Sequence, residues 1–228
     1  MKLKNPFKSL NVFEWVLWSV SMLSIVVSAV VSGKSSLLET IASLVGVTAL
    51  IFVAKGLVIG QALTVVFSFL YGIVSLQFHY WGEMITYLFM SMPIALLATI
   101  EWIRHPYKDT EVVEVSRVTK KQLVVMCVIG TVTTVVFYFI LKALDTPNIL
   151  FSTLSITTSF TAAYLTFLRS EYYGIGYGLN DIVLIVLWIL ASVEDISYLP
   201  MVVCFFMFLL NDLYGFFNWK RLSKQQKN

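Results

Sequence analysis

Eight long apolar runs follow one another along the chain, separated by short segments that carry charge, Gly or Pro. A helix needs about 20 mainly apolar residues to cross a bilayer, so each run predicts one membrane-spanning helix. The spans are expected at residues 13–31, 37–54, 57–78, 83–103, 123–144, 149–168, 175–193 and 198–217. The sequence therefore predicts an all-α polytopic membrane protein, a single membrane domain over residues 1–228 whose function lies inside the helix bundle.

The charged fraction of the chain agrees with a lipid surrounding. Only 13% of the residues are Asp, Glu, Lys or Arg and 58% are apolar, whereas a soluble domain carries about 25% charged residues. The net charge of +3 is too small an excess to indicate nucleic-acid binding. Cys127 and Cys204 fall inside apolar runs, without the spacing of metal ligands. We therefore expect membrane lipid as a partner, and no nucleic acid, metal or cofactor.

The positions of the basic residues predict how the chain is oriented. Of the 16 Lys and Arg residues, only Lys34 and Lys142 fall in loops that would lie on the side opposite the termini. Lys and Arg resist translocation, so loops rich in them stay in the cytoplasm. We therefore predict a bacterial inner-membrane protein with both termini and the loop 104–122 in the cytoplasm.

Matching features of the two halves predict an internal repeat. The second and sixth spans each end at a single cation, Lys55 and Arg169, and the fourth and eighth each end at a Trp followed by basic residues. The predicted parts are an extra N-terminal helix at 13–31, a three-helix repeat at 37–103, a linker helix at 123–144 and a second repeat at 149–219. A single linker helix gives both repeats the same orientation, as in the SWEET transporters, and places a binding site at their interface.

Two acids, each preceded by Asn, lie well away from the ends of their predicted spans, where a charged side chain is costly to insert and marks a functional site by default. Asp181 follows Asn180 in the seventh span, and Asp212 follows Asn211 in the eighth. At a rise of 1.5 Å per residue, Asp181 lies roughly 14 Å above Tyr172, near the cytoplasmic start of its span, and Asp212 lies roughly 10 Å above Trp219. The sequence therefore predicts that the two acids lie at similar depth.

Aromatic and further polar residues complete the candidate site. Tyr177 and Trp188 share a helix face with Asp181, which suits a planar ligand that stacks on rings and hydrogen-bonds at its edge. We expect Glu83 at the membrane interface, and flexibility or close helix approach at the glycines of Gly174-x-Gly176-x-Gly178. The candidate substrate-binding residues are Gln61, Thr64, Tyr87, Tyr177, Asn180, Asp181, Trp188, Asn211, Asp212 and Tyr214.

Three other interpretations of these polar residues stay open. In the first, they bond to one another and hold the helices together. In the second, Asp181 and Asp212 form the acid pair of an intramembrane enzyme, although no nucleophile or set of metal ligands accompanies them in the sequence. In the third, the chain is a structural or partner-binding membrane protein.

Several strings resemble the PnuC family of vitamin and nucleoside transporters, over nearly the whole chain. They are MKLKNPFK at the start, LIFVAKG in the second span, YWGEM before the fourth, NDIVLIVLW in the seventh and LLNDLYGFFNWKRL at the end. The resemblance implies a SWEET-like fold of three plus one plus three helices with an extra N-terminal helix. It also implies facilitated diffusion without a coupled motor, followed by trapping of the product by a cytosolic nucleoside kinase.

The departures from the family pattern bear on the substrate. Riboside carriers of this family typically show tryptophans and an asparagine where this chain has Gly174, Tyr177 and Asp181, whereas Trp188 and Asn211 match. We therefore expect a nucleoside-like substrate rich in hydrogen-bond donors, a deoxynucleoside as in the PnuN-type branch. Nicotinamide riboside is the alternative, because a carboxylate also suits its cationic ring. The oligomeric state is left open, and a homo-oligomer is among the options.

Overall fold

The structure is a computed structural model that describes residues 5–33, 35–77, 80–108 and 110–227. Lys34, one of the two basic residues expected on the side opposite the termini, lies outside the described residues. Within the described ranges the regular secondary structure is helical. The helices are η1 (Pro6–Ser9), α1 (Val12–Ser32), α2 (Leu37–Ala54), α3 (Val58–Gln77), α4 (Trp81–Thr86), η2 (Tyr87–Ser91), α5 (Met92–Arg104), α6 (Lys120–Ala143), α7 (Ile149–Phe167), α8 (Tyr173–Glu194), η3 (Ile196–Tyr198) and α9 (Leu199–Gln225).

These helices confirm the predicted fold class. Together they form eight candidate spans in the described residues, each long and apolar enough to cross a membrane. Helices α4, η2 and α5 make up one of these spans, and η3 and α9 make up another. The eighth span is longer than predicted, because α9 continues to Gln225, past the predicted end at Phe217. The helix continues because residues 218–225 contain no Gly or Pro that would end it. Trp219 is buried in this extension, and Leu222 packs against the same hydrophobic cluster.

Capping residues explain where the outer helices begin. The Asn11 side chain accepts a hydrogen bond from the backbone N–H of Glu14, and the Glu14 carboxylate accepts one from the backbone of Asn11. Thr119 and Gln122 form the same reciprocal pair at the start of α6. Each pair satisfies backbone donors that the first helical turn leaves unpaired. Helix α6 therefore begins at Lys120, three residues before the predicted start of that span.

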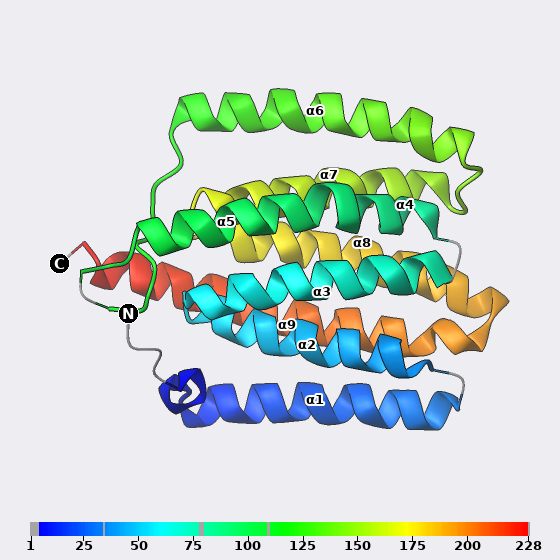
Figure 1. Ribbon diagram of the computed structural model, residues 1–228, viewed down its shortest axis with the longest axis horizontal. Coiled ribbons are helices and arrows are strands. Elements are labelled where there is room, and N and C mark those ends of the chain that lie inside the picture. Colours follow the sequence, from blue (N-terminus) through cyan, green and yellow to red (C-terminus); the bar gives the residue numbers. More distant parts are fainter. Residues whose placement is uncertain (1–4, 34, 78–79, 109, 228) are drawn as a thin grey trace.

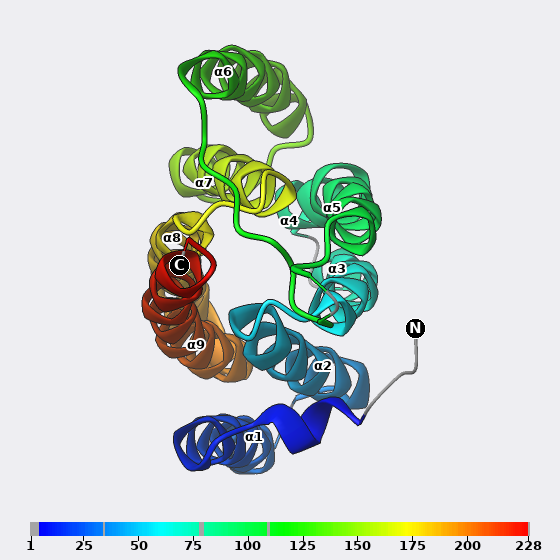
Figure 2. The same cartoon turned by 90° about the vertical axis from the view of Figure 1, so that its left-hand side faces the viewer.

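The spans form a ring of two three-span groups (Figures 1 and 2). In the first group α2 packs on α3 and α3 on α5, and in the second α7 packs on α8 and α8 on α9. Contacts between α2 and α9 and between α5 and α7 close the ring, while α1 and α6 lie outside it at opposite ends of the section in Figure 2. The two groups coincide with the two predicted repeats, whose internal similarity stays a prediction.

The described ends of the chain lie at one end of the bundle, called here the terminal end (Figure 1). The segment between α5 and α6 crosses this end (Figure 2). The backbone N–H of Val113 donates to Gly56 in the first group at 2.9 Å, and that of Ser116 donates to Arg169 in the second at 2.9 Å. The side chain of Gln226, which follows α9, donates to the carbonyl of Val113 at 3.0 Å. The segment therefore joins both groups at the terminal end.

Candidate functional site

A narrow cavity lies at the centre of the ring, between the two groups. Each of the six ring spans contributes to it, and its lining consists of Gly46, Ala49, Leu50, Val53, Gln61, Thr64, Phe67, Ser68, Tyr87, Ser91, Ser159, Tyr177, Asn180, Asp181, Phe205, Phe208 and Asp212. The volume open to the centre of a water molecule is about 40 Å³, which holds roughly three waters. In this conformation the cavity is therefore too small for a ligand of nucleoside size.

Asp181 of α8 and Asp212 of α9 meet in this cavity. Each residue is only 2% exposed, and the two carboxyl groups interact directly. One carboxylate oxygen of Asp181, Oδ2, is buried without a hydrogen-bond partner. The similar depth predicted for these acids is confirmed by their contact. Two acids face each other where an apolar bundle would be expected to hold neutral side chains.

A glycine lets the two acid-bearing helices approach each other. A Cβ atom on Gly174 of α8 would lie 2.5 Å from the carbonyl oxygen of Asp212 and 2.7 Å from the backbone nitrogen of Phe216, both on α9. Any larger residue at this position would push the helices apart. The predicted close approach at the glycine run is therefore confirmed at Gly174, one residue after the first residue of α8.

Asn180 is held in place by the neighbouring helix α7. Its side-chain oxygen accepts hydrogen bonds from Thr158 at 2.9 Å and from Ser159 at 2.8 Å. With the amide oxygen occupied, the amide NH2 group is the part of Asn180 that can bind a ligand in the cavity. The Ser and Thr residues of α7 therefore position a donor beside the acid pair.

A wide helical turn brings Tyr87 and Ser91 to the cavity. Residues Tyr87–Ser91 form a π-helical turn between α4 and α5, and Pro93 follows at the start of α5. Proline lacks the N–H that would bond to the preceding turn, and such turns often coincide with functional sites. The sequence analysis named Tyr87 but missed Ser91. Pro93 inside a predicted span was the signal that could have located this turn.

Aromatic clusters flank the cavity along the bundle. On α8, Tyr173 lies toward the terminal end of the cavity and Trp188 toward the other end. Tyr173 packs on Trp219 with ring centroids 4.8 Å apart. Trp188 donates a hydrogen bond to the hydroxyl of Tyr71 at 3.0 Å and packs on Tyr80, with centroids 4.9 Å apart. Neither Tyr173 nor Trp188 belongs to the cavity lining, so both clusters lie beyond it along the bundle.

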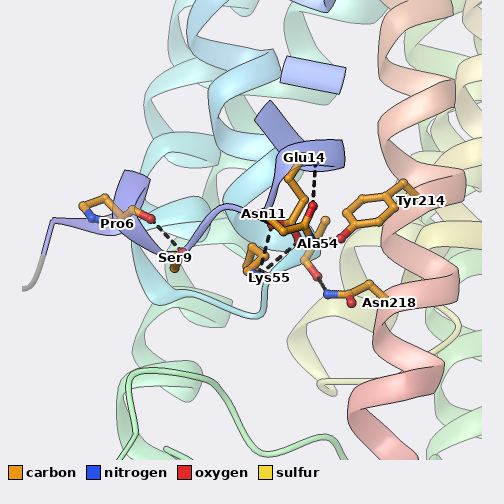
Figure 3. Close-up of polar contacts among 8 residues, drawn as sticks. All are labelled: Pro6, Ser9, Asn11, Glu14, Ala54, Lys55, Tyr214 and Asn218. Carbon is orange, nitrogen blue, oxygen red and sulfur yellow. Dashed lines mark hydrogen bonds and ion pairs between the residues drawn. The ribbon is translucent and has the colours of Figure 1, made fainter. Parts of the chain in front are cut away.

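Asn211, Tyr214 and Asn218 of α9 form a polar stripe that faces the first two helices, not the cavity. Asn211 donates to Ser21 of α1 at 3.1 Å, and Tyr214 donates to the carboxylate of Glu14, also on α1. Asn218 donates to the carbonyl of Ala54 at 2.7 Å (Figure 3). Adjacent helical residues point about 100° apart, so when Asp212 faces the cavity its neighbour Asn211 cannot. The stripe holds helices together, as the alternative interpretation of these polar groups expects.

Glu14 is the centre of the polar contacts between α1 and its neighbouring helices, as Figure 3 shows. Its carboxylate accepts hydrogen bonds from the backbone of Asn11 and the hydroxyl of Tyr214, and it lies 3.1 Å from the ammonium group of Lys55. Lys55 follows α2 and Tyr214 belongs to α9, so Glu14 joins α1 to both groups. Glu14 is fully buried, and the sequence analysis did not single it out.

The structure thus sorts the predicted site residues by location. Trp188, Asn211 and Tyr214 lie outside the cavity lining. Glu83, expected at the membrane interface, is the third residue of α4, near one end of its span. Its side chain is 1% exposed and accepts a hydrogen bond from Ser155 at 2.8 Å, and its depth in the membrane stays a prediction. Phe205 and Phe208 line the cavity but were missed, since apolar residues in an apolar span give no signal. Those that line the cavity are Gln61, Thr64, Tyr87, Tyr177, Asn180, Asp181 and Asp212, and their part in binding stays a prediction.

Two groups of three candidate membrane spans, with a buried cavity where the groups meet, form the arrangement that is typical of membrane transporters built from repeats. The family described as Nicotinamide mononucleotide transporter matches residues 36–221, and the chain belongs to it. Two relatives are named nicotinamide riboside transporter PnuC. The one from Neisseria mucosa is 27% identical over 93% of this chain and 82% of its own length. The one from Haemophilus influenzae is 27% identical over 98% of this chain and 97% of its own length.

A solved structure is similar over nearly the whole chain. It is titled the crystal structure of the vitamin B3 transporter PnuC, and it matches with a TM-score of 0.82 and 25% identity, over 95% of this chain and 94% of that one. The resemblance stated from the sequence is therefore confirmed, and the protein is a membrane transporter of the PnuC type.

Proposed function

We propose that the protein takes up nicotinamide riboside through the central cavity. The observation that carries the proposal is the pair of buried acids, Asp181 and Asp212, in the lining. The nicotinamide ring of the riboside is cationic, and a buried negative charge attracts a cation far more strongly than it would in water. The names of the relatives support the same substrate. A deoxynucleoside, our first expectation from the sequence, is neutral and has no charge to match.

The other lining residues suit the rest of such a molecule. Tyr177 and Tyr87 offer rings at the cavity wall, and aromatic rings attract planar and cationic groups. The amide of Asn180 offers a donor, and Gln61 and Ser68 of α3 offer polar groups opposite. In our proposal the acids select the charge, the tyrosines contact the ring, and the amides and hydroxyls bind the ribose and carboxamide.

Transport would follow from movement of the two groups around this site. In our proposal the two aromatic clusters act as gates, and each would open in turn while the other stays closed. We propose that this takes place in a bacterial inner membrane with both termini in the cytoplasm. The movement would need no ATP, and a cytosolic kinase would trap the riboside by phosphorylation.

Uptake into liposomes tests the proposal. Purified protein is reconstituted, and the entry of labelled nicotinamide riboside is compared with that of labelled thymidine, without ATP. We expect riboside to equilibrate at least about tenfold faster than thymidine, since only the riboside gains from the buried acids. Faster entry of thymidine would instead favour the deoxynucleoside assignment.

Two controls make the result specific. Asp145→Asn changes a carboxylate to an amide in an exposed loop, at a positive φ of 50° that Asn tolerates, and we expect wild-type uptake. Mass spectrometry of the compound recovered from the vesicles distinguishes transport from catalysis. Intact riboside supports transport, whereas cleaved riboside would support the intramembrane enzyme.

A further inference from the structure

Two tryptophans bond the groups to each other at the terminal end. The ring N–H of Trp102 of α5, in the first group, donates to the carbonyl of Thr166 of α7, in the second group, at 3.0 Å. In the reverse direction, Trp219 of α9 donates to the carbonyl of Val53 of α2 at 2.9 Å. The two tryptophan rings pack together with centroids 5.2 Å apart. Parting of the groups at the terminal end would therefore break both bonds.

A short stretch of chain covers these tryptophans. It consists of residues 112–116, in the segment that crosses the terminal end (Figure 2), and is called here the strap. The side chain of Val113 is fully buried and belongs to one hydrophobic cluster with Trp102 and Trp219. The strap is therefore part of the closed terminal end, and it has to leave one group when the two groups part.

The strap is bonded to the same position of each group. The backbone N–H of Val113 donates to the carbonyl of Gly56, and that of Ser116 donates to the carbonyl of Arg169, both at 2.9 Å. Gly56 comes two residues after the end of α2, and Arg169 comes two residues after the end of α7. Both have a left-handed backbone, with φ of 71° and 57°. One stretch of chain thus holds the two groups together at equivalent points.

The strap is built onto the first group through its backbone. The N–H of Glu114 donates to the carbonyl of His105, the residue after α5, at 2.9 Å, and the N–H of Tyr107 donates to Val112 at 2.8 Å. Val112 also forms an antiparallel bridge with Leu57, at the start of α3. Such a backbone ladder is lost only when the local chain unfolds. We therefore expect the strap to move with the first group.

The second group holds the strap through a side-chain clamp. The amide of Gln226, which follows α9, donates to the carbonyl of Val113 at 3.0 Å and accepts from the N–H of Val115 at 2.7 Å. The guanidinium group of Arg169 adds an ion pair with Glu101 of α5 at 3.6 Å. A side chain can change rotamer and release its partner without refolding the backbone. The second group is therefore the side from which the strap detaches.

We propose that the strap is a latch for the terminal end, and that Gln226 and Arg169 release it each time this end opens. They are positioning residues, because they contact the strap and Glu101 and do not line the cavity. Their bonds exist only while the two groups are together, so the latch favours the conformation that is closed at the terminal end. The inference rests on the proposed movement of the two groups, and it holds for any ligand that this movement carries.

Disulfide bonds on the two sides of the strap test the proposal. Ser116 forms a bridge with Ser170 of the second group, as Val112 does with Leu57 of the first, and bridged positions are close enough for a disulfide. In Ser116→Cys/Ser170→Cys, oxidation should lower riboside uptake into liposomes at least about tenfold, and reduction should restore it. In Leu57→Cys/Val112→Cys, oxidation should leave uptake unchanged. Loss of uptake with the second disulfide, or its survival with the first, would overturn the proposal.

Thiol labelling tests the latch without any ligand. Ser170 is 1% exposed, so Ser170→Cys is expected to react with a water-soluble maleimide when the strap lifts. The background carries Cys127→Ala, and Cys204 is buried. Gln226→Leu removes both bonds of the clamp and should speed labelling at least about fivefold. Gln225→Leu, the same change at an exposed neighbouring position, should leave the rate unchanged.

The labelling result is independent of the substrate. An unchanged rate in Gln226→Leu would overturn the latch and leave the proposed function standing. Faster labelling in Gln226→Leu, together with absence of riboside uptake by the wild type, would support the latch and overturn the proposed substrate alone.

Discussion

Two buried acids of the bundle, Glu14 and Asp181, differ in their partners. Glu14 bonds to the backbone of Asn11, to Lys55 and to Tyr214 (Figure 3). Asp181 is buried to a similar degree but faces another acid and leaves Oδ2 without a partner. A buried carboxylate surrounded by donors stabilises the contacts around it, whereas an unpartnered one destabilises the fold. The comparison separates an acid that holds the helices together from one that is available to a ligand.

The largest expected effect concerns transport. Asp181→Asn removes a carboxylate from the cavity wall, so we expect riboside uptake to fall about tenfold or more. The melting temperature in detergent should stay the same or rise, because the substitution removes a buried charge that has no donor. Uptake into liposomes and thermal unfolding of the same preparation check both parts.

The control for this variant is Asp145→Asn, in which the same chemical change takes place on the surface. It should leave both uptake and melting temperature unchanged. If Asp181→Asn instead lowered the melting temperature and spared uptake, Asp181 would belong with Glu14 as a structural acid. The contrast between the two regions would then be wrong.

The next effect concerns stability. Glu14→Ala leaves the ammonium group of Lys55 and the hydroxyl of Tyr214 without their acceptor, and we expect a loss of about 2–3 kcal/mol. The melting temperature should fall by several degrees, and uptake per folded molecule should stay close to the wild-type value, since Glu14 does not line the cavity. Thermal unfolding in detergent and uptake normalised to folded protein measure the two.

Ser9→Ala is the matched control in the same region. Ser9 donates to the carbonyl of Pro6 at an exposed position (Figure 3), so its removal should change stability by no more than about 0.5 kcal/mol. A loss as large as that of Glu14→Ala would show that the whole N-terminal segment, and not the carboxylate of Glu14, holds α1 in place.

The comparison also shows what a sequence can predict about such a protein. Hydropathy is a local property, so the spans and the depth of Asp181 and Asp212 could be derived from residue spacing. The face that each helix turns to its neighbours depends on how distant segments pack. Tyr214 and Asn211 therefore met α1 instead of the cavity, and Glu14, at the start of the first span, gave no sign of its role.

Local departures from a regular helix were equally hard to predict. The hydropathy of the fourth span is continuous, yet a π-helical turn at Tyr87–Ser91 changes which side chains point inward. Trp188 shares a face of α8 with Asp181, but it lies about two turns farther along the helix, where it bonds to Tyr71. The helical periodicity of the sequence identified the face of α8 that Asp181 and Trp188 share. How far the cavity extends along that face depends on contacts between aromatic rings of different helices, which periodicity does not predict.

The smallest effect is expected at Glu83, which lies between the two cases. Its Oε1 accepts a hydrogen bond from Ser155 at 2.8 Å, its Oε2 is buried without a partner, and the residue does not line the cavity. In Glu83→Gln the amide oxygen can still accept from Ser155, so stability should change by no more than about 0.5 kcal/mol and uptake only slightly.

Ser155→Ala, which leaves both oxygens unpartnered, should lower stability more, by about 1–2 kcal/mol. Uptake and thermal unfolding of both variants measure this difference. Glu83→Gln could instead reduce uptake as strongly as Asp181→Asn. A buried carboxylate oxygen without a partner would then mark a functional acid even outside the cavity lining, and location in the cavity would not be needed to separate functional from structural acids.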